Sequence, residues 1–392
     1  MDDFFPKGSR LVRSLLLLLI PLLFSSCGKN DFTTLARKDL FSLHPGVMPD
    51  ELDYYLRDDH FLSGRSDLFM KDGLFYISSS SMSKIMGFNS YGDLLFLLMD
   101  ESKNPPPEMG EGNKSSNKRY ASWPFKEIGQ IAMNGDILLV EDQVTEDKRV
   151  FDNALDTLCS RIILRFDREG NYLNFLGKEG IGGSPFPFIS DIRCRKNGDF
   201  LVICQVSLGQ QIFWYSPEGE LLYHIIINND NLPLFEEDYW GSLVKLTCHP
   251  EEYKLYLLTD YYPLDMESAG KGSERRLYTL NLADKQYDKG VKIPELTQRE
   301  EGRELKYIYD LLGTTEEGTH LLLAKTGGTS NSLIAINEEG KTLFSRRMEL
   351  FDQPEIFSTW FLSDDGMLMA LTLLDSEAPV SWWRSDKLLN RE

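Results

Sequence analysis

The stretch IRCRKNGDFLVICQ, residues 192–205, places two short apolar runs on either side of an Asn-Gly pair. Asn-Gly between alternating apolar residues is a strong short-range signal for a β-hairpin. Two further apolar runs follow, QQIFWYS (210–216) and ELLYHIII (220–227), with Pro-Glu-Gly between them. The segment therefore predicts four short antiparallel strands joined by tight turns.

The turn also fixes where we expect the cysteines of this hairpin. A two-residue Asn197-Gly198 turn would place Cys194 opposite Leu201 and Cys204 on the other face of the sheet. A disulfide needs a Cα separation of about 4.4–6.8 Å, which this offset exceeds. We therefore expect free, packed thiols at Cys159, Cys194, Cys204 and Cys248.

The same four-strand unit recurs along the chain. Glycines mark the first turn of five units, about 50–65 residues apart, which is close to the length of a β-propeller blade with insertions. These turn residues are Gly73, Gly135, Gly198, Gly318 and Gly366; the fourth unit has no turn glycine, and Tyr253 lies near that position. The sixth unit lacks its outer strand, and the apolar run RKDLFSLH (37–44) can supply it and close the ring. The sequence thus predicts an all-β fold, a six-bladed β-propeller of four-stranded antiparallel blades closed by an N-terminal strand.

The first residues of the chain have the features of an export signal. Lys7, Arg10 and Arg13 precede an apolar run from residue 15 to residue 24, and Ser-Ser-Cys27 follows. The run is too short to remain as a membrane-spanning helix and is typical of a cleaved signal peptide. The sequence LFSSC resembles the lipobox of bacterial lipoproteins, which implies lipidation of Cys27. An ordinary signal peptide with an incidental cysteine is the alternative.

A wider resemblance combines these features. The stretch YLNFLGKEGIGGSPFPFISDIRCRKNGDFLVICQ (172–205) resembles an NHL-type propeller repeat, in which a Gly-rich link and a proline precede the inner strand. With the lipobox, the chain resembles NHL- and TolB-like six-bladed propeller lipoproteins of the spirochaete type. We expect a signal peptide at 1–26, a lipidated tether and ring-closing strand at 27–60, and the propeller at 61–392. The resemblance implies a fold and a membrane anchor but no activity.

Composition and motifs limit the classes of function that we expect for this chain. With 42 basic and 61 acidic residues, the net charge of −19 argues against general electrostatic binding of nucleic acid. The five histidines form no HExxH motif, and no Gly-x-Ser-x-Gly elbow is present. Asp191 and Asp310 could face a central tunnel, but two carboxylates do not make a calcium site. We therefore predict no catalytic residues, no metal and no cofactor.

The long connections predict where a partner would bind. In an up-and-down blade they all belong to one face of the propeller, and binding residues tend to lie on long loops of a rigid scaffold. Aromatic residues gather in or beside these connections: Trp123, Phe151, Tyr239, Trp240, Tyr261 and Tyr262. As the alternative, these side chains cover blade edges.

We therefore expect a non-enzymatic, lipid-anchored scaffold or binding protein of the cell envelope, with a protein or glycan partner. It would be attached to the membrane through Cys27 and face the periplasm or the cell surface. One alternative is a hydrolase of the lactonase or esterase type with a divalent metal in the tunnel. Another is a surface-exposed lipoprotein that contacts a host or the environment.

Overall fold

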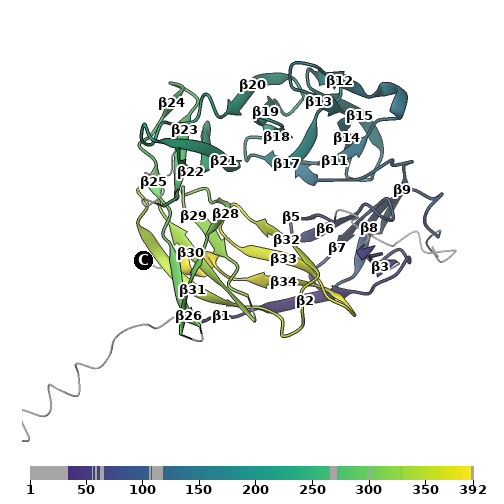
Figure 1. Ribbon diagram of the computed structural model, residues 1–392. Helices are drawn as coiled ribbons and strands as arrows, with labels where there is room; N and C mark the ends of the chain where they lie inside the picture. Colours follow the sequence, from purple (N-terminus) through teal and green to yellow (C-terminus); the bar gives the residue numbers. More distant parts are fainter. Residues whose placement is uncertain are drawn as a thin grey trace, which may run out of the picture. The chain divides into compact units, whose positions relative to one another are not determined.

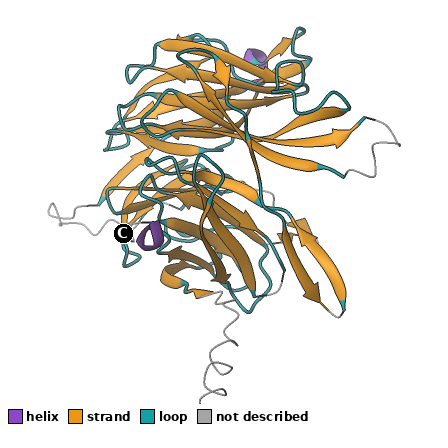
Figure 2. Cartoon of the chain, turned by 90° about the vertical axis from the view of Figure 1, so that its left-hand side faces the viewer, coloured by secondary structure: helices purple, strands orange, loops and turns teal. Residues whose placement is uncertain are grey.

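The computed structural model describes residues 34–54, 56–57, 60–61, 66–105, 107, 118–264, 272–300, 302–327 and 329–389. The expected signal peptide (1–26) and Cys27 lie outside this part of the chain. The described residues form six small β-sheets arranged in a ring, a six-bladed β-propeller (Figure 1). Within the described residues, helix is confined to η1 (Glu146–Lys148) and α2 (Asp386–Leu389), and Figure 2 shows mainly strands and loops. In the described residues no helix has the length and hydropathy to span a membrane.

We number the blades 1 to 6 in chain order and give their strands from the inside outward. Blade 1 contains β5 (Leu68–Lys71), β6 (Leu74–Ser79), β7 (Lys84–Phe88), β8 (Leu94–Met99) and β9 (Arg119–Ser122). Blade 2 contains β10 (Ile131–Asn134), β11 (Ile137–Gln143), β14 (Arg161–Phe166), β15 (Tyr172–Gly177) and β16 (Gly180–Ile181). Blade 3 contains β17 (Phe188–Cys194), β18 (Phe200–Val206), β19 (Gly209–Tyr215) and β20 (Leu221–Asn228).

The remaining blades repeat this order. Blade 4 contains β21 (Tyr239–Cys248), β22 (Lys254–Pro263) and β23 (Glu274–Asn281), whose outer edge pairs with β24 (Gln286–Tyr287) and β25 (Val291–Lys292). Blade 5 contains β28 (Asp310–Thr314), β29 (His320–Ala324), β30 (Ser330–Ile336), β31 (Thr342–Glu349) and β1 (Thr34–Leu35). Blade 6 contains β32 (Phe357–Leu362), β33 (Leu368–Leu373), β34 (Ala378–Trp383) and β2 (Lys38–Leu43). Blades 1, 2, 4 and 5 therefore carry more strands than the four predicted.

The N-terminal strand closes the ring, as predicted. β2 runs antiparallel to β34, with Lys38 opposite Trp382 and Leu43 opposite Ala378. The Ser381 hydroxyl donates a hydrogen bond to Asp39 Oδ1 at 2.7 Å. Leu43, only 3% exposed, belongs to the apolar cluster between blades 6 and 1. The outermost strand of the last blade thus comes from the start of the described chain.

The hydrophobic core consists of separate clusters, each at the boundary between two blades. The buried apolar residues form six clusters, one between each pair of neighbouring blades. In the cluster between blades 2 and 3, for example, Ile163 packs with Phe200 and Val202, all fully buried. Because each blade buries side chains on both faces of its sheet, its central strands are almost continuously apolar. This explains runs such as LLFLLM in β8 and HLLLA in β29.

The hairpin at 192–205 forms with a different register from the predicted one. Cys194 pairs with Phe200, not Leu201, because three residues rather than two form the turn. The Gly198 N–H donates to the Arg195 carbonyl at 3.0 Å, and Gly198 has φ +89°, as in a type I turn with a G1 bulge. The expected placement of Cys204 on the opposite face was therefore wrong, because it shares the face of Cys194.

The side chain of Asp199 stabilises the longer turn. Its Oδ2 accepts hydrogen bonds from Arg195 Nη1 at 2.9 Å and Asn197 Nδ2 at 2.9 Å. The Tyr253 hydroxyl, from blade 4, donates to the same oxygen at 3.2 Å. This carboxylate ties the turn to the neighbouring blade. The four cysteines of the described chain are free thiols, since Cys194 and Cys204 remain several positions apart in the ladder.

Candidate functional site

One face of the propeller carries the long connections. Strand direction alternates within each blade, so the loop between the second and third strands opens on the same face as the link to the next blade. We call this the long-loop face; its described residues include 144–160, 229–238, 264, 272–273, 293–300 and 302–309. The extra hairpins of the described chain also lie in connections of this face. They are β3 (Leu56–Arg57) with β4 (His60–Phe61), β12 (Val150–Asp152) with β13 (Thr157–Cys159), and β26 (Leu296–Glu300) with β27 (Arg303–Tyr307).

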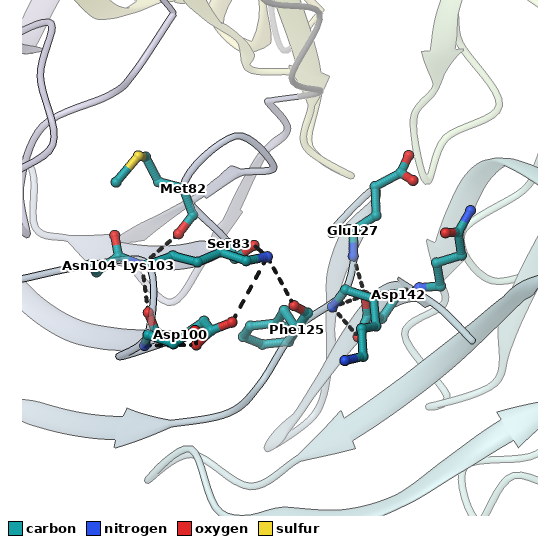
Figure 3. Close-up of polar contacts among 11 residues, drawn as sticks. Met82, Ser83, Asp100, Lys103, Asn104, Phe125, Glu127 and Asp142 are labelled. Carbon is teal, nitrogen blue, oxygen red and sulfur yellow. Dashed lines mark hydrogen bonds and ion pairs between the residues drawn. The ribbon is translucent and has the colours of Figure 1, made fainter. Parts of the chain in front are cut away.

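Polar side chains fix the connection between blades 1 and 2 (Figure 3). Lys103 Nζ donates hydrogen bonds to Ser83 Oγ at 2.8 Å and to the Phe125 carbonyl at 3.2 Å. At the end of the connection, Asp142 Oδ1 accepts the backbone N–H groups of Lys126 and Glu127 at 3.0 and 2.7 Å. The start of this connection is therefore attached to the β6–β7 loop and its end to β11.

Trp240 and Tyr262 form an exposed aromatic pair on blade 4. They lie directly opposite each other on β21 and β22, and their rings stack with centroids 4.9 Å apart and an interplanar angle of 30°. Trp240 is 46% exposed and Tyr262 37% exposed. Of the six aromatic residues predicted for a binding face, these two form the exposed pair. Phe151 is also exposed but lies in the separate β12–β13 hairpin, in the connection between β11 and β14.

Of the other three predicted aromatic residues, two are buried in the core and Trp123 is half-buried. Tyr239 and Tyr261 belong to the core between blades 3 and 4, and the Tyr261 hydroxyl donates to the Pro233 carbonyl at 2.6 Å. Trp123 stacks on Tyr172 of blade 2 with centroids 4.3 Å apart. The alternation of a strand explains the division, because adjacent residues such as Tyr261 and Tyr262 point to opposite faces.

A charged network supports the aromatic pair. Arg275 on β23 binds Asp260 on β22 with two hydrogen bonds, from Nε to Oδ1 at 2.6 Å and from Nη2 to Oδ2 at 2.7 Å. Its Nη1 group donates to Asp310 Oδ1 of blade 5 at 2.6 Å. The Tyr262 hydroxyl donates to Asp260 Oδ2 at 3.3 Å. This network links blade 4 to blade 5 and holds the ring of Tyr262; sequence reasoning missed Asp260 and Arg275 because cross-strand partners leave no local pattern.

A cavity of about 830 Å³ lies on the axis of the propeller and is lined by the inner strands of all six blades. Its size is within the range of ordinary ligand pockets, about 300–1,000 Å³. Both acids that the sequence suggested for a tunnel are engaged by arginines. Asp191 accepts a hydrogen bond from Arg193 Nε at 2.7 Å, and Asp310 is bound by Arg275. Nowhere in the described ranges do three or more His, Cys, Asp or Glu residues lie close enough to hold a metal ion.

Asp67 is the most perturbed acid of the cavity. Its Oδ2 accepts the Ile131 N–H at 3.0 Å and its Oδ1 accepts the Leu68 N–H at 3.0 Å. Burial raises the pKa of this carboxyl to about 6, the backbone hydrogen bond from Ile131 opposes the rise, and the nearby charge of Asp191 adds to it. Asp67 can therefore change its charge near neutral pH.

Comparisons with known proteins add little to this description. No protein-family model and no curated protein matches the sequence. Among solved structures, the chain is similar to an ulvan lyase of polysaccharide lyase family 25, at 11% identity and a TM-score of 0.42, over 88% of this chain and 82% of that one. The same lyase bound to -[GlcA(1-4)Rha3S]- gives 11% identity and a TM-score of 0.39, over 89% and 82%. The assignment of the fold rests on strand pairing and not on this likeness.

The raised pKa of Asp67 predicts how stability depends on pH. Between its ordinary value of 3.8 and the folded-state value of about 6, the folded protein binds this proton more tightly than the unfolded chain does. Stability from this group is therefore full below the ordinary value and is lost as pH rises toward the folded-state pKa. Asp67→Asn does not titrate but keeps only one of the two oxygens that accept backbone N–H groups. We therefore expect an offset from the lost hydrogen bond that does not depend on pH. On top of it, the free energy of unfolding relative to the wild type should rise by at most about 3 kcal/mol as pH increases to above about 6.

Urea unfolding followed by fluorescence, at low protein concentration and between about pH 4.5 and about pH 7.5, measures this difference. Asp72→Asn serves as the matched control, because it removes one exposed carboxylate from the same cavity lining. The difference between D67N and the wild type should grow with pH, while that of D72N stays small. Parallel pH profiles for D67N and the wild type would contradict the assignment.

Proposed function

We propose that this chain is a lipid-anchored binding protein of the cell envelope that holds a partner protein on its long-loop face. The observation that supports this best is the exposed, stacked pair Trp240–Tyr262. Trp and Tyr are the residues that most often dominate binding energy at protein interfaces. Here two of them lie side by side near the ends of two long strands, where these strands enter the long-loop face.

The pair is also ordered before binding. Its rings are a cross-strand pair in a regular ladder, and the Tyr262 hydroxyl is attached to Asp260, which Arg275 holds with two hydrogen bonds. A rigid aromatic surface loses little side-chain entropy when it binds a partner. An apolar group of a partner can therefore pack on these rings at low entropic cost.

The anchor is a separate part of the proposal. The sequence LFSSC resembles a lipobox, and an apolar run with basic residues before it precedes that sequence. We place the lipid on Cys27, so that the propeller is held at a membrane and faces the periplasm or the cell surface. The resemblance to NHL- and TolB-like propeller lipoproteins belongs to this proposal as well.

Replacing both aromatic residues tests the binding surface. In a crosslinking pull-down from its own membrane, the W240A–Y262A double variant should recover at least about tenfold less partner protein than the wild type, because hot-spot side chains each contribute 2 kcal/mol or more. Tyr91→Ala is the matched control, since Tyr91 is an aromatic residue that is 86% exposed in the β7–β8 turn on the opposite face.

Equal recovery of partner with the double variant would remove the aromatic pair from the proposal. No protein enriched over an unrelated lipid-anchored control would overturn the proposal of a protein partner. Recovery of glycan without protein would also overturn it and would instead favour a glycan-binding surface. Loss of partner with Y91A to the same extent would show that the effect is not specific to the long-loop face.

Replacing Cys27 tests the anchor. The Cys27→Ala variant has no thiol for lipidation, so it should not incorporate a labelled fatty acid that the wild type incorporates. Ser26→Ala keeps a small residue before Cys27 and should be labelled like the wild type. Labelling of C27A to the wild-type extent would contradict lipidation at this residue.

A further inference from the structure

The axial cavity has a different charge balance from the rest of the protein. The chain as a whole has 61 acidic and 42 basic residues, whereas the residues that line the cavity include four acidic and five basic ones. The acids are Asp67, Asp72, Asp191 and Asp364, and the bases are Lys71, Arg193, Arg195, Lys196 and Lys245. In an acidic protein, positive charge is therefore concentrated along the axis.

Most of these cations have a partner or are in contact with solvent. Arg195 Nη1 lies 2.9 Å from Asp199 Oδ2, and Lys196 binds Glu251 at 3.0 Å and also Glu316. Lys71 ends β5 at the turn, where its side chain is exposed. None of these side chains needs a further anion.

Lys245 is different. It lies on the inner strand β21 at a β-bulge, where the register with β22 shifts between Leu243 and Lys245. Its side chain is partly buried against the cavity and makes no ion pair or hydrogen bond with any residue in the described part of the chain. Burial lowers the pKa of its amine, and the positive charge of Arg193 lowers it further. A partly buried ammonium without a counterion is unfavourable, since it has lost water without gaining a partner.

Arg193 lies close enough to Lys245 for the two charges to interact, and it has donors to spare. Its guanidinium uses Nε for Asp191, and neither Nη group has a partner among the residues that the structure describes. Its side chain, 26% exposed, lines the same cavity. The planar fork of an arginine suits two oxygens of a carboxylate, sulfate or phosphate, and a lysine adds a point charge.

Four carboxylates lie near this pair, and none of them occupies the Lys245 ammonium or the Arg193 Nη groups. Asp191 is bound by Arg193 Nε, and Asp310 is bound by Arg275 and is 69% exposed. Asp67 accepts backbone N–H groups from Ile131 and Leu68. Asp364 lines the cavity and its charge interacts with that of Arg193, but no hydrogen bond or ion pair joins the two among the described residues.

We propose that the axial cavity binds an oxyanion, a carboxylate or a sulfate or phosphate group, with the ammonium of Lys245 and the Nη groups of Arg193 as its donors. The volume of about 830 Å³ leaves room for a ligand larger than the anionic group itself. This site is separate from the aromatic pair of the long-loop face, so either can exist without the other.

Calorimetric titration with simple anions tests the site. Sodium sulfate, sodium phosphate and sodium succinate are titrated at constant ionic strength, with sodium chloride as the blank. We expect saturable binding of at least one of them to the wild type and at least about tenfold weaker binding to Lys245→Met, which keeps the length of the side chain and removes its charge. Succinate alone would identify a carboxylate site, and sulfate or phosphate alone a tetrahedral one.

Two further variants make the result specific. Lys71→Met removes the exposed lysine of the same cavity and should bind like the wild type, while Lys245→Arg should retain binding. No saturable binding of any of the three anions to the wild type would overturn the proposal. Equal binding by K245M, or equal loss with K71M, would also overturn it, because the effect would then come from the general potential of the cavity.

The chemical reactivity of the Lys245 amine gives a second test of anion binding, one that does not rely on the heat of binding. Bound anion should slow reductive methylation of Lys245, followed by mass spectrometry, and leave the rate at Lys71 unchanged. Chloride at the same ionic strength should not slow it. Equal rates at Lys245 with and without the anion that binds would place that anion elsewhere.

Discussion

The antiparallel ladder between β2 and β34 is the constraint on which the rest of this structure depends. It joins residues as far apart as Asp39 and Ser381, which are separated by 342 positions. The cost in chain entropy of closing a loop rises only slowly with its length. One ladder and one apolar cluster can therefore keep the ring closed. The axial cavity has six inner strands around it only because the ring is closed.

Closure also explains how the two faces differ. Short turns on one face keep neighbouring strands in register, and several are tied to the next blade, as Asp199 is to Tyr253. The connections of the long-loop face contribute less to strand register, because the strands that they join are already paired with neighbouring strands of their blades. They can therefore accept hairpins such as β12–β13 and β26–β27 without changing the core. Rigid strands that end in variable connections suit a binding surface.

Much of the fold could be predicted from the sequence, because its signals are local. Turn glycines and alternating apolar runs gave the blades, and the run at 37–44 gave the closing strand. The register of the hairpin at 192–205 could not be predicted, since it involves the contacts of Asp199 with Arg195 in the same turn and with Tyr253 of blade 4. The candidate site was predicted in part: alternation could have separated Trp240 from Tyr239. The lack of an ion-pair partner for Lys245 among the described residues depends on the bulge in β21 and on the neighbouring blades. No local sequence pattern reveals either of these.

Hydrogen exchange at the closing ladder tests this account most directly. If closure by β2 holds the propeller together, the β34 amides that donate to β2 should exchange only when the whole protein unfolds, at the same opening free energy as the central amides of β18. Exchange of these β34 amides well before those of β18 would contradict it. That result would mean that β2 leaves the ring while the six blades stay folded.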